Sequence, residues 1–131
     1  MTLLLLPTSI GDAVDKLTIL EIKLERIEDQ VKRGNVAREL GLVSKELAAA
    51  ERELCFTDLR GRLKDVNSQL WDVEDSIRDH ERRRDFGDDF IRLARSVYRL
   101  NDQRAQLKRE INLLFGSTLL EEKAYADYDR S

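Results

Sequence analysis

Apolar residues recur at alternating spacings of three and four over most of this chain, which is the period of an amphipathic helix. Four such seams follow one another, separated by short breaks at Gly34, at Cys55 and Phe56, and at Gly87 and Asp88. Each seam predicts a helix with one face turned towards a shared core. The seams are Ile10, Ala13, Leu17, Leu20, Leu24, Ile27 and Val31; Val36, Leu40, Val43, Leu47, Ala50 and Leu54; Leu59, Leu63, Val66, Leu70, Val73 and Ile77; and Phe90, Leu93, Val97, Leu100, Arg104, Leu107, Ile111 and Leu114.

Residues that favour helix ends mark where the four predicted helices begin and stop. Ser9, followed three residues later by Asp12, predicts the first N-terminus as a variant of the capping box. Gly34 is expected to break this helix, and Asn35 to cap the second one. The remaining expected boundaries are a cap at Thr57, a break at Gly87 and Asp88, a fourth helix from about Asp89 to Phe115, its closure at Gly116 and Ser117, and one last short turn suggested by Ser117 and Glu121.

Four helical segments with short connections predict an all-α protein, an antiparallel bundle of about four long amphipathic helices. We expect one domain over residues 1–131, with an extended N-terminal segment at 1–8 that lies against the bundle and a loose tail at 126–131. The seam slips by only about a residue near Thr57, so the second and third helices could also be one. The alternative architecture is an extended antiparallel coiled coil that completes its core by dimerising.

Composition and charge narrow the classes of partner. The 131 residues include one proline and 37% charged side chains, and the net charge is −3. That balance argues against a nucleic-acid-binding protein, because such proteins present clustered basic surface. The single cysteine, Cys55, indicates a reducing compartment. The run Leu3–Leu6 is too short for a secretion signal, and no stretch reaches the roughly 20 apolar residues of a membrane span. We therefore expect a cytoplasmic protein with no membrane partner.

Most cofactor and catalytic chemistries lack the residues that they need. His80 is the only histidine, and it lies amid arginine and aspartate near a helix end, where an exposed position is expected. Zinc sites need several Cys and His ligands, and di-iron bundles need repeated Glu-x-x-His pairs. The scattered glycines form no phosphate-binding loop. We expect no metal and no cofactor.

A polar stripe runs beside the apolar seam of the fourth predicted helix, and Arg104 is the single charge within that seam. A cation at such a position must reach water, pair with a carboxylate or face a ligand. Mixed rows on the first and third helices could converge on the same region. The arrangement suits an internal salt-bridge network, a site for an anionic ligand or partner, or a catalytic site. The candidate ligand-binding residues are Lys16, Lys23, Arg26, Trp71, Glu74, Arg78, Arg95, Tyr98, Asn101, Asp102, Arg104, Lys108 and Asn112.

Three long strings resemble a family of short bacterial proteins of unknown function. They are SIGDAVDKLTILEIKLERI from Ser9, LWDVEDSIRDHE from Leu70, and FIRLARSVYRLNDQRAQLKREINLLFGSTLLEEKAY from Phe90. The resemblance covers nearly the whole chain and implies a stand-alone, single-domain cytoplasmic protein without an assigned activity. It also draws attention to further residues within these strings, namely Asp15, Glu21, Asp75, Glu122, Lys123 and Tyr125.

A second, shorter resemblance concerns one helix. The spacing of Asp15, Leu20 and Arg26 is similar to the first helix of the small all-helical chorismate mutases. Those enzymes hold a dicarboxylate between Arg and Lys side chains inside a bundle, by electrostatic preorganisation and without a cofactor. Our leading hypothesis is instead a non-enzymatic bundle that binds a partner or a small anionic ligand. The alternatives are a small cofactor-free enzyme of this mutase type and a structural module that forms a homodimer.

Overall fold

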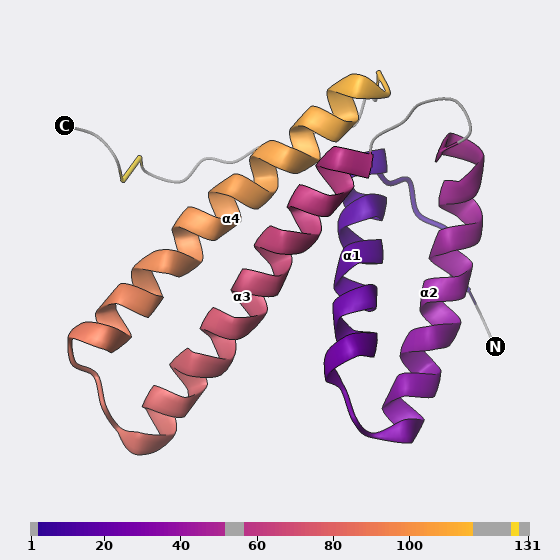
Figure 1. The fold of residues 1–131 in the computed structure, drawn as a ribbon. Helices are drawn as coiled ribbons and strands as arrows, with labels where there is room; N and C mark the ends of the chain where they lie inside the picture. Colours follow the sequence, from indigo (N-terminus) through magenta and orange to yellow (C-terminus); the bar gives the residue numbers. More distant parts are fainter. Residues whose placement is uncertain (1–2, 52–56, 117–126, 129–131) are drawn as a thin grey trace.

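The computed structural model describes residues 3–51, 57–116 and 127–128, and within them the chain forms four α-helices and no strand (Figure 1). The all-α bundle predicted from the seams is confirmed. In Figure 1, α2 and α3 run in opposite directions, so they are two separate helices. The helices are α1 (Ile10–Arg26), α2 (Gln30–Glu51), α3 (Thr57–Arg83) and α4 (Asp88–Leu114).

The helices form two antiparallel hairpins that diverge like the arms of a fork (Figure 1). One arm is α1 with α2, and the other is α3 with α4. The arms meet where the start of α1 lies near the start of α3 and the end of α4, and they separate towards the two hairpin turns. α1 lies against all three other helices, whereas α2 approaches only α1 among the four described helices. α1 is therefore the helix that connects the two arms.

The start of α1 follows the predicted capping pattern. Ser9 is extended, and its hydroxyl oxygen accepts a hydrogen bond from the backbone N–H of Asp12 at 3.1 Å. Asp12 lies in the first turn, where its negative charge is favourable beside the positive end of the helix dipole. The prediction of a capped N-terminus at Ser9 is confirmed.

The predicted break at Gly34 is wrong, because α1 ends at Arg26 and Gly34 lies inside α2. The chain turns earlier, where the carboxylate of Asp29 accepts a hydrogen bond from the backbone N–H of Lys32 at 3.0 Å. Asn35 also lies within α2 and caps nothing at its start. A glycine inside a helix costs only about 1 kcal/mol relative to alanine, so local capping by Asp29 outweighs it.

Arg33 secures the turn between α1 and α2 from the other side. Its guanidinium donates to the carbonyl oxygen of Leu24 and, at 3.0 Å, to that of Ile27. These carbonyls belong to the end of α1, where intrahelical partners run out. Val31, placed by its spacing on the first seam, is instead 76% exposed at the start of α2.

The other boundaries agree with the sequence to within a residue or two. Thr57, expected as the cap of the third helix, is the first residue of α3. Gly116 closes α4 with a φ of 64°, in the left-handed region that suits glycine, and its N–H bonds to the carbonyl of Leu113 at 3.2 Å. The short turn expected at Ser117 and Glu121 lies outside the described residues.

The core forms where α1 is enclosed by the other helices. Val14 and Ile22 are 0% and 1% exposed although neither belongs to the predicted seam. Because α2 covers one side of α1 and the α3–α4 hairpin covers another, α1 needs more than one apolar face. The apolar core cluster consists of Val14, Leu17, Leu47, Leu63, Val66, Leu100, Leu107 and Ile111.

His80 is buried, which corrects the expectation of an exposed histidine. Its Nδ1 lies 3.0 Å from the carbonyl oxygen of Asp85, and its ring lies 6.2 Å from that of Phe90. The chain folds back over the end of α3 because Arg84 takes a left-handed φ of 53°. The turn itself therefore buries the imidazole.

The N-terminal segment does not pack as expected. Leu3, Leu4, Leu5 and Leu6 are 61%, 79%, 92% and 70% exposed, so these side chains are not held against the helices. Residues 3–8 form no helix or strand. A stretch long and apolar enough to span a bilayer is not found in any described helix.

Candidate functional site

A buried polar cluster connects the two arms of the fork. The Arg104 guanidinium on α4 clasps the carboxylate of Asp15 on α1, with Nε at 2.9 Å from Oδ1 and Nη2 at 2.5 Å from Oδ2. Asn67 on α3 donates to the same Oδ1 and to the hydroxyl of Thr18, both at 2.9 Å. Asp15 is only 5% exposed. One carboxylate thus links α1, α3 and α4.

A second contact between α1 and α4 lies about one helical turn closer to the start of α1. The side-chain oxygen of Asn112 accepts a hydrogen bond from the backbone N–H of Gly11 at 2.6 Å. Lys108, 8% exposed, pairs with Asp12 at 2.9 Å. A Cβ on Gly11 would lie 2.5 Å from the backbone oxygen of Lys108, so glycine permits this approach. Lys108 and Asn112 therefore hold α4 against the start of α1.

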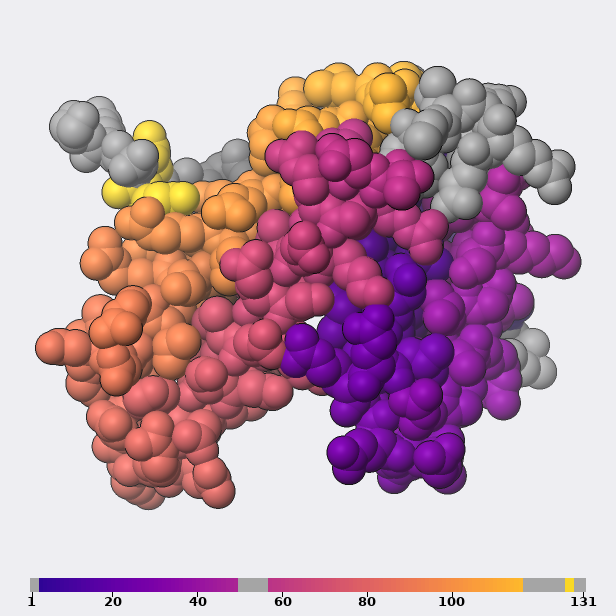
Figure 2. Space-filling model, in the orientation of Figure 1, coloured from indigo at the N-terminus to yellow at the C-terminus, as the bar shows by residue number. Residues whose placement is uncertain are grey.

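Beyond the buried polar cluster, the diverging arms leave an open hollow of about 510 Å³, which we call the fork hollow. In Figure 2 the surface is notched between α1 and the lower part of α3. Five of the thirteen predicted site residues meet here from α3 and α4, with Ile19 and Ile22 of α1 opposite them. The lining consists of Ile19, Ile22, Asn67, Leu70, Trp71, Glu74, Asp75, Arg78, Asn101 and Arg104.

The fork hollow combines an aromatic wall with both signs of charge. Arg78 pairs with Glu74 one helical turn away at 2.8 Å, and the two side chains are 71% and 44% exposed. Asp75 adds an exposed carboxylate. Trp71 is half-buried, and its indole N–H has no acceptor among the residues that the structure describes. Two guanidiniums and two carboxylates thus surround an apolar surface.

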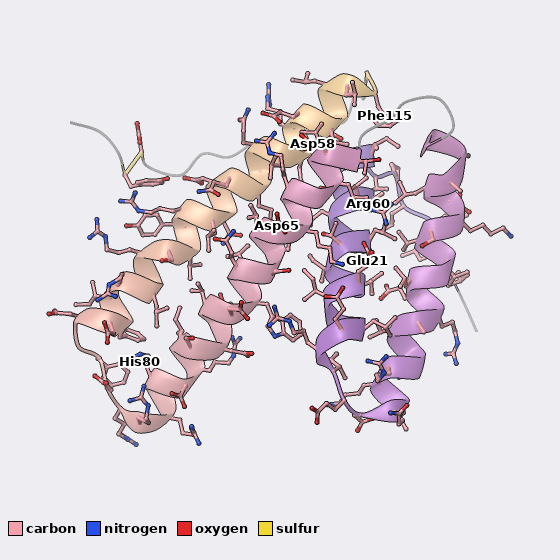
Figure 3. All side chains as sticks on the ribbon, viewed as in Figure 1. Glu21, Asp58, Arg60, Asp65, His80 and Phe115 are labelled. Carbon is pink, nitrogen blue, oxygen red and sulfur yellow. The ribbon has the colours of Figure 1, made fainter. Side chains whose placement is uncertain are left out.

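Half-buried and exposed ion pairs also bridge α1 and α3. Figure 3 shows Glu21 of α1 and Arg60 of α3 facing each other, at 3.4 Å. Lys64 pairs with Glu25 at 2.7 Å. Water reaches the side chains of both pairs, so each contributes at most about 1 kcal/mol. The buried cluster, rather than these pairs, fixes how the arms join.

The predicted cations of α1 lie outside the fork hollow. Lys16 pairs with Glu39 of α2 at 2.9 Å, on the far side of α1. Arg26, at the end of α1, pairs with Asp72 of α3 at 2.5 Å, and this hydrogen bond raises the pKa of the guanidinium. Lys23 is half-buried and does not line the hollow. The three cations do not converge.

Three residues of the predicted stripe on α4 point elsewhere. Arg95 lines a shallow hollow on α4 itself. The ring of Tyr98 lies 4.8 Å from that of Tyr128. Asp102 lines another hollow, of about 640 Å³, between α3 and α4. The stripe is continuous in sequence, but the structure divides it among several surroundings.

Comparison with known proteins gives one match that spans nearly the whole chain. Residues 5–128 match the model of a family described as a family of unknown function, DUF6165. The chain belongs to this family. No curated protein and no solved structure matches it. The family description assigns no chemistry, so the geometry above is the basis for inference about function.

Sequence reasoning noticed most of the buried cluster but gave its key residues no role. Asp15 stood out only through the two family resemblances, and Asn67 was not among the candidate residues. Thr18, whose hydroxyl donates to the carbonyl of Asp15 at 2.8 Å, gave no signal. The available signal was Arg104, because a cation inside an apolar seam must reach water, pair with a carboxylate or face a ligand. Among the described residues, no group of acidic, His or Cys side chains is arranged to hold a metal ion.

Proposed function

We propose that this protein is a non-enzymatic binder that takes a small ligand with an anionic group in the fork hollow. The observation that carries the proposal is that five predicted site residues of α3 and α4 line the fork hollow, which faces α1. They are Trp71, Glu74, Arg78, Asn101 and Arg104. A few placed polar groups on a partly apolar wall are the usual composition of small-molecule sites.

Different residues of the fork hollow contact different groups of such a ligand. Among the described residues Arg78 is held by Glu74 alone, in an exposed pair that contributes about 0.3–0.5 kcal/mol, so its guanidinium can turn to an anionic group at little cost. Trp71 offers a flat face and an N–H donor. Glu74 and Asp75 accept from hydroxyl or ammonium groups of the same ligand. The site therefore suits a molecule that carries donors beside its anionic group.

The pairing of Arg104 with Asp15 disfavours catalysis of the mutase type. A dicarboxylate clamp needs cations turned towards the substrate, whereas Asp15 already supplies both carboxylate oxygens to Nε and Nη2 of Arg104. Arg26, which carried the resemblance to chorismate mutases, pairs with Asp72 outside the hollow. Two of the cations that such an enzyme would use are thus engaged by carboxylates of the chain itself.

Tryptophan fluorescence offers a direct test, because Trp71 is the only tryptophan in the chain. Molecules that co-purify with the protein are identified by mass spectrometry, and anionic metabolites are then titrated while Trp71 emission and the melting temperature are followed. A true ligand at one hundred times its Kd adds roughly 2.7 kcal/mol of stability.

Matched variants decide whether the hollow is the site. Arg78→Gln removes a cation of the fork hollow, and Arg82→Gln removes one from the same helix that pairs with Asp79 outside it. We expect the fluorescence and thermal responses to disappear with Arg78→Gln and to remain with Arg82→Gln. A ligand whose thermal response survives both Arg78→Gln and Trp71→Phe binds elsewhere, and the proposal then fails.

A second proposal is self-association to a homodimer, which the exposed leucines at Leu3–Leu6 favour. Four adjacent leucines in water form an apolar patch of the kind that marks interaction surfaces. A two-fold homodimer is the commonest arrangement that covers such a patch. Sedimentation should show a dimer at micromolar concentration that Leu4→Ser with Leu5→Ser converts to a monomer. A monomeric wild-type protein contradicts this.

The location proposed for the protein is the cytoplasm. Its support is the single cysteine, which cannot form an intrachain disulfide. Fractionation of cells that carry a tagged chain tests this, with recovery in the soluble cytoplasmic fraction as the expected result.

A further inference from the structure

Three arginines share one face in the first half of α4. Arg92, Arg95 and Arg99 are spaced by three and four residues, so their side chains neighbour one another on the helix surface. Together they line a shallow hollow of about 430 Å³ with Asp88, Ile91 and Ser96. In Figure 1 this half of α4 lies far from the α1–α2 hairpin. We call this surface the arginine face.

The arginine face differs in charge from the other hollows along the hairpin. Its lining carries three guanidiniums and one carboxylate, Asp88. The fork hollow has equal numbers of each sign, and the hollow that contains Asp102 has more carboxylates than guanidiniums. The whole chain has a net charge of −3. A local excess of positive charge is therefore unusual for this protein.

Little in the described part of the chain neutralises these cations. Arg92 pairs with Asp89 at 2.7 Å, but both side chains are more than 70% exposed, so the pair exchanges readily with solvent. Arg99 lies over the ring of Tyr128, with its guanidinium carbon 5.2 Å from the ring centre. Arg95, between them, has no carboxylate partner among the described residues. Like charges at this spacing repel, which disfavours the arrangement in the absence of an anion.

We propose that the arginine face binds a phosphate group. Guanidinium is planar and offers paired donors that match phosphate oxygens, and three of them around one hollow surround a dianion. Tyr128 restricts Arg99, so less freedom is lost when an anion binds. This site is separate from the fork hollow and does not depend on its function.

The phosphate belongs either to a free metabolite or to a phospholipid headgroup. Ile91, 51% exposed, lines the same hollow and would contact the apolar part of either molecule. Nucleic acid does not fit, because a duplex needs basic contacts over a longer surface than these two helical turns. The shared chemistry is a phosphate monoester or diester beside an apolar group.

The test uses the full chain and two probes. Inorganic pyrophosphate is titrated by calorimetry, and phosphatidylcholine vesicles with and without phosphatidic acid are co-sedimented with the protein. Arg95→Gln removes the central guanidinium, Arg95→Lys keeps its charge without the planar fork, and Arg38→Gln makes the same charge change on exposed α2. Circular dichroism checks that each variant folds.

We expect binding to at least one probe, weakened about tenfold or more by Arg95→Gln, less by Arg95→Lys, and hardly at all by Arg38→Gln. Binding to pyrophosphate assigns a soluble phosphate, and binding only to vesicles that contain phosphatidic acid assigns a lipid headgroup. Absence of binding to both probes overturns the proposal. Equal weakening by Arg38→Gln and Arg95→Gln also overturns it, since binding would then follow net charge alone.

Discussion

Replacement of Arg104 by leucine tests the buried link between the arms of the fork. The change leaves the Asp15 carboxylate, whose side chain is 7% exposed, with the hydrogen bond from Asn67 as its contact with another helix in the described part of the chain. Removal of one member of a buried ion pair costs about 3–5 kcal/mol. Because Arg104 is itself 30% exposed, water can partly reach the site, and we expect a loss of about 3 kcal/mol, near the lower end of that range.

A double variant separates the pair from its parts. Asp15→Asn combined with Arg104→Leu removes both charges and keeps an acceptor for Asn67. Its free energy of unfolding should recover to within about 1 kcal/mol of wild type, since neutral replacement of a buried pair is often close to neutral. Arg109→Leu, an exposed change on the same helix, should stay within about 0.5 kcal/mol of wild type.

Urea denaturation followed by far-UV circular dichroism measures wild type, these three variants and the single variant Asp15→Asn, and unchanged m-values show that the comparison is one of stability. If Arg104→Leu is as stable as wild type, the buried pair contributes nothing, and the reasoning from Asp15 is refuted. If the double variant loses the sum of two large single losses, the two side chains act independently, and the assigned coupling is wrong.

Two more predictions concern a helix contact and an acid-side titration. Gly11→Ala places a methyl group 2.5 Å from the backbone oxygen of Lys108 and should cost about 1–3 kcal/mol in urea denaturation, whereas Gly34→Ala, with nothing within 4 Å, should gain about 0.5–1 kcal/mol; equal effects contradict the close approach. The hydrogen bond from Arg82 lowers the pKa of Asp79, so this carboxylate stabilises the fold above its ordinary pKa of 3.8 and the contribution is lost as pH falls through the lower folded value. An NMR titration of the Asp79 carboxyl should have its midpoint below that of free aspartate, and a midpoint at the free value rules the bond out.

The sequence predicted the helices well because helix period and capping are local properties. Ser9 and its neighbours contain all that is needed to start α1, and the seams of α3 and α4 follow directly from spacing. Gly34 misled because a single glycine is a weak breaker, while the turn depends on Arg33 reaching back to carbonyls six and nine residues earlier. Such a side-chain bond leaves no periodic trace.

The candidate site was predictable only as a set of residues, without their partners. Arg104 was expected to reach water, pair with a carboxylate or face a ligand, but its partner Asp15 lies 89 residues earlier on another helix. A single sequence carries no information about which of many carboxylates comes close. The divergence of the arms was equally invisible, and it decides that Trp71 and Arg78 border open space while Lys108 and Asn112 are enclosed.

The placement of α2 at one edge of the molecule has a consequence for how the protein opens. Because α2 approaches only α1 among the described helices, it can detach while α1, α3 and α4 keep their shared polar cluster. Loss of α2 removes Leu47 from the core cluster and uncovers the face of α1 against which α2 packs. Its backbone amides should therefore exchange with deuterium through a partial unfolding that requires less free energy than global unfolding. The chain would then consist of two cooperative units of unequal strength, with α2 as the weaker one.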